Sequence, residues 1–165
     1  MTLPATLNIK NKPLHFFYTR FLLKLSSLQV SLRGELLIFG VGIDIIETER
    51  LERELLKGSE GLIEAAFTRG EIEYCRRKKN RAESYAVRFA AKEAFLKALG
   101  TGMQAGINLK EIETVNNVSG NPELKFKRKA KSFLKKNKIS KIHVSLSHIK
   151  TTAIAVVIIE HFKEV

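Results

Sequence analysis

The chain has 165 residues, of which 44% are hydrophobic, so it is long and apolar enough to fold as one globular domain with a buried core. A single cysteine, Cys75, excludes an internal disulfide framework and is typical of a reducing compartment. The formal net charge of +12 indicates an acidic partner, a class that includes nucleic acids, anionic membranes, polyphosphate ligands and acidic proteins.

The first 36 residues differ in composition from the rest of the chain. They hold five basic residues and one acid, and these charges interrupt the apolar runs well before the roughly 20 residues that a membrane span requires. Small cleavage-site residues after a clean apolar stretch are missing, which argues against a secretory signal. Two interpretations remain: an organellar leader, or a mis-set upstream start with the working chain beginning at Leu37. We therefore predict an N-terminal extension over 1–36 and a working domain over 37–165.

The first elements of the working domain follow the extension directly. LLIFGVGIDII, residues 36–46, is apolar and rich in β-branched side chains, which predicts a buried strand. ETERLERELLKG, residues 47–58, predicts a helix that ends at Gly58. Thr68 and Glu71 have the spacing of a capping box, so a second helix is expected to begin directly after Thr68.

The longest predicted helix covers residues 82–99 and ends at Gly100. After it, the patterns predict two short strands, a basic helix and a hairpin of two longer strands, at 108–115, 122–127, 127–138, 141–148 and 151–160. This order of elements predicts an α+β fold with a mostly antiparallel sheet and packed helices.

Asp44 is an acid in the middle of GVGIDII, which is otherwise apolar. A carboxylate in a buried strand costs several kcal/mol unless it is paired or binds a cation. Because a helix follows within a few residues, Asp44 is either a helix-capping residue at the end of the strand or a ligand for a hard cation. The local sequence leaves both interpretations open.

Phe89, Glu93 and Lys97 are four residues apart and share one face of the longest predicted helix. Glu93 and Lys97 are either a surface ion pair, worth only a few tenths of a kcal/mol, or part of a site. The alanines beside them permit the close approach of another element. Magnesium is usually held by one or two carboxylates together with phosphate oxygens. Asp44 and Glu93 would supply these carboxylates, and Lys97 would neutralise phosphate charge.

The stretch HVSLSH alternates, and it places His148 at the end of a strand. A histidine in this position is more often structural or solvated than functional. Ser145 and Ser147 are weak candidates for a nucleophile because neither lies in an elbow-type motif.

Two basic regions stand out in the working domain. Arg50, Arg53 and Lys57 form a cationic stripe on the first predicted helix, but interspersed glutamates weaken a nucleic-acid interpretation. The run KFKRKAKSFLKKNK is more strongly basic, and it either binds phosphates or forms a solvated helix exterior.

The motifs are more specific in combination than singly. GVGIDIIETERL, FTRGE, RFAAKEAFLKALGTG, GNP and VSLSH occur in this order at compatible spacing. Over about residues 38–160 they resemble the holo-[acyl-carrier-protein] synthases, the small trimeric branch of the 4'-phosphopantetheinyl transferases. The resemblance implies the fold of that family, a homotrimer, and coenzyme A bound between neighbouring subunits. It implies transfer of 4'-phosphopantetheine from coenzyme A to a serine of apo-acyl carrier protein, which leaves adenosine 3',5'-bisphosphate and supports fatty acid biosynthesis.

The resemblance also implies roles for single residues. Asp44 and Glu93 match the family's ligands for Mg²⁺, with Mn²⁺ as the alternative ion. Lys97 matches a lysine that contacts the pyrophosphate region or assists the leaving group, and His148 matches a histidine in the same cleft. The implied catalytic residues are therefore Glu93, Lys97 and His148, of which Lys97 and His148 contact coenzyme A. The base remains open between Glu93, a metal-bound water and another carboxylate.

Arg50 and Lys57 match docking positions for the carrier protein, and Arg53 joins them by helical spacing alone. An acidic carrier protein accounts for the basic charge better than nucleic acid, because base-stacking aromatic motifs are missing. A different magnesium-dependent phosphotransferase or phosphohydrolase would share the metal chemistry, but a Walker-type loop and a paired-aspartate motif are missing. We expect no nucleic acid partner, no membrane span, and a cytoplasmic location unless the extension is a genuine organellar leader.

Overall fold

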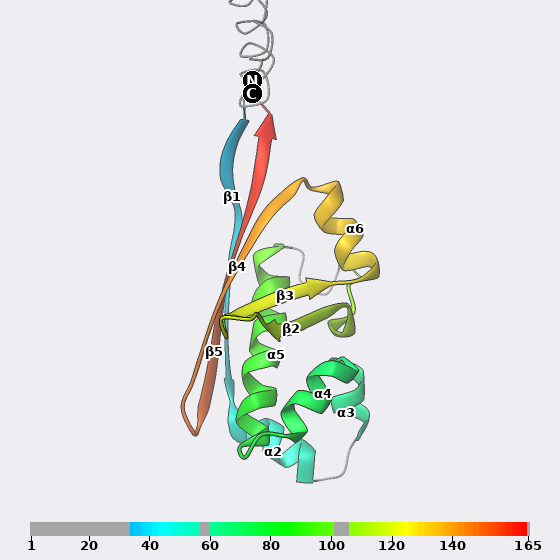
Figure 1. Ribbon diagram of the computed structural model, residues 1–165, viewed down its shortest axis with the longest axis vertical. Helices are drawn as coiled ribbons and strands as arrows, with labels where there is room; N and C mark the ends of the chain where they lie inside the picture. Colours follow the sequence, from blue (N-terminus) through cyan, green and yellow to red (C-terminus); the bar gives the residue numbers. More distant parts are fainter. Residues whose placement is uncertain (1–33, 57–59, 101–105, 165) are drawn as a thin grey trace, which may run out of the picture. The chain divides into compact units, whose positions relative to one another are not determined.

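The computed structural model describes residues 34–56, 60–100 and 106–164, which form an α+β fold, as the sequence predicts (Figure 1). In chain order the elements are β1 (Gly34–Glu47), α2 (Thr48–Leu56), α3 (Glu60–Ala66), α4 (Arg69–Arg76), α5 (Arg81–Ala98), the 3₁₀ turn η3 (Leu109–Glu111), β2 (Ile112–Asn116), β3 (Pro122–Phe126), α6 (Arg128–Lys136), β4 (Ile139–His148) and β5 (Thr152–Glu164). None of the helices in these ranges is both long enough and apolar enough to cross a membrane.

The strands form two sheets. The larger has the order β1-β5-β4, and the smaller pairs β2 with β3. The predicted terminal hairpin is confirmed, because β4 pairs antiparallel with β5 in a register that runs from Ile139 opposite His161 to His148 opposite Ala153. The smaller sheet is also antiparallel. The chain thus brings the end of β4 to a tight hairpin turn, where His148 lies.

The helix α5 forms the centre of the core and packs against β1. Its alanines at 90, 91 and 94 are fully buried, and small side chains let a neighbouring backbone approach closely. A Cβ atom added at Gly40 would overlap the carbonyl oxygen of Ala98, and one added at Gly42 would overlap that of Ala94. The close approach expected from the alanines is therefore present, and the element that approaches is β1.

Helix α4 begins at Arg69 behind the predicted capping box. The Thr68 Oγ1 accepts a hydrogen bond from the Glu71 N–H at 3.3 Å, and the Glu71 carboxylate accepts one from the Thr68 N–H at 2.9 Å. At the other end of the core, Gly100 ends α5 with a φ of +69°, a conformation that glycine adopts without strain.

A buried ion pair joins α5 to the elements around it. The Lys92 Nζ lies 2.7 Å from Glu71 Oε2 and also donates to the carbonyl oxygens of Ala66 and Leu109, at 2.6 and 3.0 Å. Both charged side chains are fully buried. Burial lowers the pKa of Lys92, and the Glu71 carboxylate opposes this shift. The pair fixes α5 against the end of α3, the start of α4 and η3.

Three elements differ from the sequence prediction. The strand β1, predicted to be buried, exposes the side chains of Val41, Ile43 and Ile45 on one face. The helix α3 was not predicted, because its seven residues are too short for a clear helical period. The first residues of the predicted strand 108–115 instead form η3, where the Asn108 side chain accepts a hydrogen bond from the Lys110 N–H at 2.9 Å. The predicted end of the first helix, Gly58, lies outside the described residues.

Candidate active site

Asp44 lies on β1 two residues after Gly42, where β1 contacts α5. The Lys97 Nζ donates a hydrogen bond to Asp44 Oδ1 at 2.7 Å, and the Asp44 side chain is only 14% exposed. The capping interpretation of Asp44 is wrong, because Asp44 lies within β1, four residues before the first residue of α2, and its carboxylate accepts from Lys97. Asp44 is thus a largely buried carboxylate matched by a half-exposed lysine.

Glu93 is half-buried on α5, close to the same charges. Burial raises its pKa, the Asp44 carboxylate raises it further, and Lys97 and Arg50 act in the opposite direction. The structure therefore brings Asp44, Glu93 and Lys97 together. Lys97 does not simply pair along the helix surface with Glu93, since it reaches across to β1.

Asp44 and Glu93 are the carboxylates that could hold a divalent cation. Among the described residues no group of three or more His, Cys, Asp or Glu side chains is arranged to enclose a metal ion. Two carboxylates suit Mg²⁺, which keeps several waters and takes other oxygen ligands from substrate phosphates. Two carboxylates at the β1–α5 contact would thus make an open site rather than a closed structural one.

Arg50 connects α2 to this site. Its guanidinium carbon lies 5.9 Å from the centre of the Phe89 ring, and Phe89 precedes Glu93 by one helical turn. Arg53 lies on the same helix and is exposed. Lys57, the third residue of the predicted docking stripe, lies outside the described residues. Arg50, on the exposed surface of α2, therefore lies close to Glu93.

His148 does not join the other candidate residues within this chain. Its Nδ1 lies 3.3 Å from Glu83 Oε2, at the first turn of α5. Glu83 precedes Glu93 by ten residues, which is about 15 Å along a helix. The expectation that His148 shares a cleft with Lys97 is therefore not met by the residues of a single chain.

His148 lines a separate cavity of about 450 Å³, whose wall includes Lys78, Lys79, Glu83 and Arg88. The position of Arg88 is unusual, since its side chain is only 5% exposed and its guanidinium lies 3.9 Å from the centre of the Tyr74 ring.

One guanidinium nitrogen of Arg88 donates to the Ser84 carbonyl at 3.1 Å. Its buried Nε has no hydrogen-bond partner among the described residues. Burial alone would raise the pKa of Tyr74, but hydrogen bonds and charge from Lys78 and Arg88 outweigh it, so that this pKa is lowered.

Sequence reasoning missed Arg88, Lys78 and Glu83. The available signal for Arg88 was a single charge inside the apolar stretch YAVRFAA, but its stacking on Tyr74 is a tertiary contact. The resulting cavity combines cations with an aromatic ring, which suits a phosphorylated ligand.

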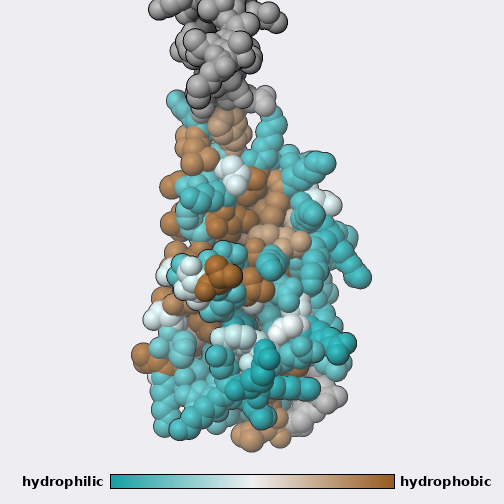
Figure 2. All heavy atoms as spheres, in the orientation of Figure 1, coloured by the Kyte–Doolittle hydropathy of each residue, from teal (hydrophilic) through white to brown (hydrophobic). Residues whose placement is uncertain are grey.

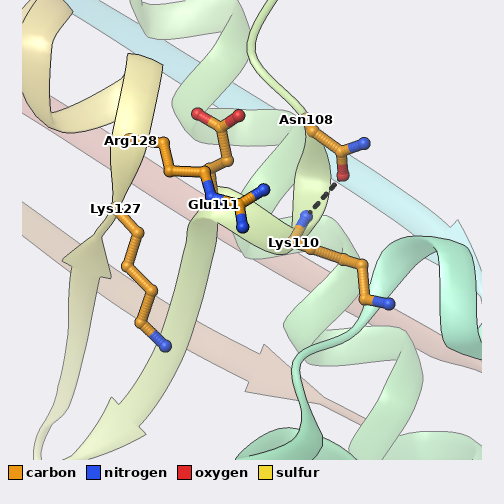
Figure 3. Close-up of a pocket in the computed structure, with 5 residues that line it drawn as sticks. All are labelled: Asn108, Lys110, Glu111, Lys127 and Arg128. Atoms are coloured by element: carbon orange, nitrogen blue, oxygen red, sulfur yellow. Dashed lines mark hydrogen bonds between the residues drawn. The ribbon is translucent and has the colours of Figure 1, made fainter.

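A second cavity, of about 350 Å³, lies beside η3 and the start of α6, and none of the predicted site residues lines it (Figure 3). Two of its charged side chains, those of Glu111 and Lys127, make contacts within the fold. The Glu111 carboxylate accepts the Ala130 N–H of α6 at 3.0 Å, and the Lys127 Nζ lies 3.0 Å from Glu113. The basic run predicted as a helix is indeed α6, and its lysines are exposed.

Comparison with known proteins agrees with this fold. Residues 40–157 match the 4'-phosphopantetheinyl transferase superfamily. A holo-[acyl-carrier-protein] synthase from Geobacter sp. strain M21 is 47% identical over 124 residues, which are 75% of this chain and 99% of that relative.

Solved structures agree with the sequence match. The holo-[acyl-carrier-protein] synthase of Neisseria meningitidis has a TM-score of 0.69 and 29% identity over 74% of this chain and 98% of its own. The synthase of Bacillus anthracis, in complex with CoA (3',5'-ADP), has a TM-score of 0.62 and 35% identity over 75% of this chain and 97% of its own. The chain belongs to the holo-[acyl-carrier-protein] synthase family, which confirms the resemblance drawn from its motifs.

Proposed function

We propose that the chain transfers the 4'-phosphopantetheine group of coenzyme A to a serine of apo-acyl carrier protein, in support of fatty acid biosynthesis. The observation that carries the proposal is the meeting of Asp44, Glu93 and Lys97 at the β1–α5 contact, in a chain of this family. In the reaction the serine oxygen bonds to the phosphorus that bears pantetheine. The pyrophosphate P–O bond breaks, and adenosine 3',5'-bisphosphate leaves with the electron pair.

Asp44 and Glu93 would hold Mg²⁺, or Mn²⁺ as the alternative, and the ion would neutralise pyrophosphate charge when bound. The Lys97 side chain is 54% exposed, so its ammonium group can turn from Asp44 to a phosphate oxygen. The serine proton must go to a base, for which the candidates are Glu93, a metal-bound water and another carboxylate.

The cavity at His148 would take the phosphorylated adenosine end of coenzyme A. Lys78, Lys79 and Arg88 supply positive charge there. In one chain His148 lies beside the first turn of α5, and Glu93 lies about 15 Å further along that helix. We therefore propose that the two halves of a site come from neighbouring subunits of a homotrimer.

The outer face of β1 supports an oligomer. Val41, Ile43 and Ile45 alternate along the strand and are 58%, 55% and 67% exposed. Figure 2 shows hydrophobic side chains on the surface of the described chain, among the hydrophilic ones. A second and third copy of the chain would cover this stripe, which water otherwise contacts.

The acidic partner is then the carrier protein, which we propose docks on α2 through Arg50 and Arg53, with Lys57 following them in the sequence. We further propose that the enzyme works in the cytoplasm, in keeping with its single free, buried Cys75. Residues 1–36 precede the part of the chain that matches the family, and we propose that transfer does not require them.

Mass spectrometry tests the proposal directly. Apo-acyl carrier protein incubated with the chain, coenzyme A and Mg²⁺ should gain the mass of one phosphopantetheine group, and adenosine 3',5'-bisphosphate should appear in equal amount. Carrier protein whose acceptor serine is replaced by alanine should gain nothing. If the intact carrier protein gains no mass with any divalent ion, the proposed function is wrong.

A further inference from the structure

Glu83 is an acid in a cavity otherwise suited to anions. Among the described residues that line this cavity, Glu83 is the only acid, and Lys78, Lys79 and Arg88 are cations. An isolated carboxylate here would repel a phosphate. The Glu83 Oε2, however, lies 3.3 Å from His148 Nδ1, and the Glu83 side chain is only 15% exposed. Its charge is therefore directed at the histidine.

The contact joins a rigid element to a strand end. Glu83 lies in the first turn of α5, where the helix dipole favours a negative charge. His148 is the last residue of β4, next to a hairpin turn in which the Ile149 N–H donates to the Thr152 carbonyl at 2.8 Å. Glu83 thus contacts a half-exposed ring that lies at the end of its strand.

A carboxylate can only accept, so a hydrogen bond across this 3.3 Å contact requires a proton on His148 Nδ1. The hydrogen bond made by one ring nitrogen sets the protonation of the other. With the proton held on Nδ1, the neutral ring has its lone pair on Nε2, and the protonated ring has an N–H donor there. The charged groups that line the same cavity as this ring are Glu83 and Arg88 of α5 and Lys78 and Lys79 of the α4–α5 connection. Lys150 of the hairpin turn, together with Glu83, lines an adjoining cavity.

We propose that Glu83 is a positioning residue, which holds His148 through Nδ1 so that Nε2 is presented to the phosphorylated adenosine of coenzyme A. The inference rests on the proposed function, because it takes the ligand of this cavity from it. Glu83 acts through His148 and does not touch the ligand. Glu83 therefore increases the affinity for the nucleotide, although the Glu83 carboxylate and the phosphate are both negatively charged.

Titration calorimetry with adenosine 3',5'-bisphosphate tests the proposal. Glu83→Gln should weaken binding about fivefold to tenfold, and it should raise KM for coenzyme A with little change in kcat, as expected for loss of uniform binding. The matched control is Glu73→Gln, an exposed glutamate on α4 that pairs with Arg69 and should leave the affinity unchanged.

The double variant separates positioning from a structural effect. In a His148→Gln background, Glu83→Gln should cost no further affinity, because the group it acts through is gone. An equal loss in both backgrounds, or tighter binding by Glu83→Gln alone, would overturn the proposal.

Nitrogen NMR provides a readout that does not depend on activity. Free imidazole favours the proton on Nε2, whereas the His148 ring should show a protonated Nδ1 in the parent chain and lose this signature in Glu83→Met. His148→Gln identifies the signal among the four histidines. Failure of the parent chain to modify the carrier protein would refute the proposed function, whereas an unchanged NMR signature would refute the role of Glu83 alone.

Discussion

At the scale of single residues, the charges of Asp44, Glu93 and Lys97 depend on one another. Lys97 compensates Asp44 at 2.7 Å, and Glu93 is left under the influence of a buried carboxylate. Two nearby acids resist ionisation together unless a cation is shared between them. A cation bound between the two carboxylates would therefore relieve this repulsion, which otherwise lowers stability, and both effects can be measured.

Asp44→Asn and Glu93→Gln should each lower the rate of carrier-protein modification at least about a hundredfold, since either removes a charged ligand for the divalent ion. Circular dichroism should show unchanged secondary structure, because both substitutions preserve side-chain shape. The control is Glu64→Gln, an exposed glutamate of α3. Undiminished transfer by either variant would remove that residue from the proposed metal site.

Glu93 also predicts a dependence of stability on pH. Its pKa is raised above the usual 4.5, so the native state binds the proton more readily than the unfolded chain does. Ionisation of Glu93 therefore costs stability as pH rises above about 4.5, the ordinary value. In the absence of divalent ions, Glu93→Gln should melt at a higher temperature than the parent chain at pH 7, and the difference should vanish at pH 4. A lower melting temperature at pH 7 would contradict this.

At the scale of elements, the buried Lys92–Glu71 pair holds α5 in place. Lys92→Met should cost about 3–5 kcal/mol of unfolding free energy, because it leaves the buried Glu71 charge without its partner. Adding Glu71→Gln should recover part of the loss. The exposed Arg69–Glu73 pair is the comparison, and Arg69→Ala should change the free energy by less than about 1 kcal/mol in urea unfolding.

The β1–α5 contact allows a second test at this scale. Gly42→Ala places a methyl group against the Ala94 carbonyl, so we expect a loss of about 1–3 kcal/mol and displacement of Asp44. Gly61→Ala is the matched control, since a Cβ there meets nothing within 4 Å and Gly61 lies in α3. It should be neutral or stabilising. Equal effects of the two substitutions would show that the contact is not tight.

The sequence predicted those elements whose signals are local. The capping box at Thr68 gave the start of α4, and alternation gave the β4–β5 hairpin. Asp44 could be singled out because a charge in an apolar strand requires a counter-charge, and the structure shows that Lys97 supplies it at 2.7 Å. The burial of Lys92 and the contact between Glu83 and His148 could not be predicted in this way. Both depend on contacts between elements distant in the sequence, for which periodicity carries no information.

At the scale of the whole molecule, the proposed division of the site between neighbouring subunits predicts complementation between variant chains. Glu93→Gln and His148→Gln should each be impaired alone. When the two chains are unfolded together and refolded as a mixture, random assembly should restore about a quarter of the sites, because each interface then combines intact halves in that proportion. Light scattering should show trimers throughout. A mixture no more active than its components would indicate that both residues serve a site within one chain.

The backbone contact between β1 and α5 also bears on how such a chain can change over evolutionary time. Gly40 and Gly42 lie directly against the carbonyl groups of Ala98 and Ala94, so no intervening side chain sets the separation of strand and helix. Substitutions among the larger core residues can then accumulate while the distance between Asp44 and the carboxylate on α5 stays constant. Substitutions are then better tolerated in the rest of the core. Larger side chains at Gly40, Gly42, Ala94 or Ala98 would instead move Asp44 relative to α5.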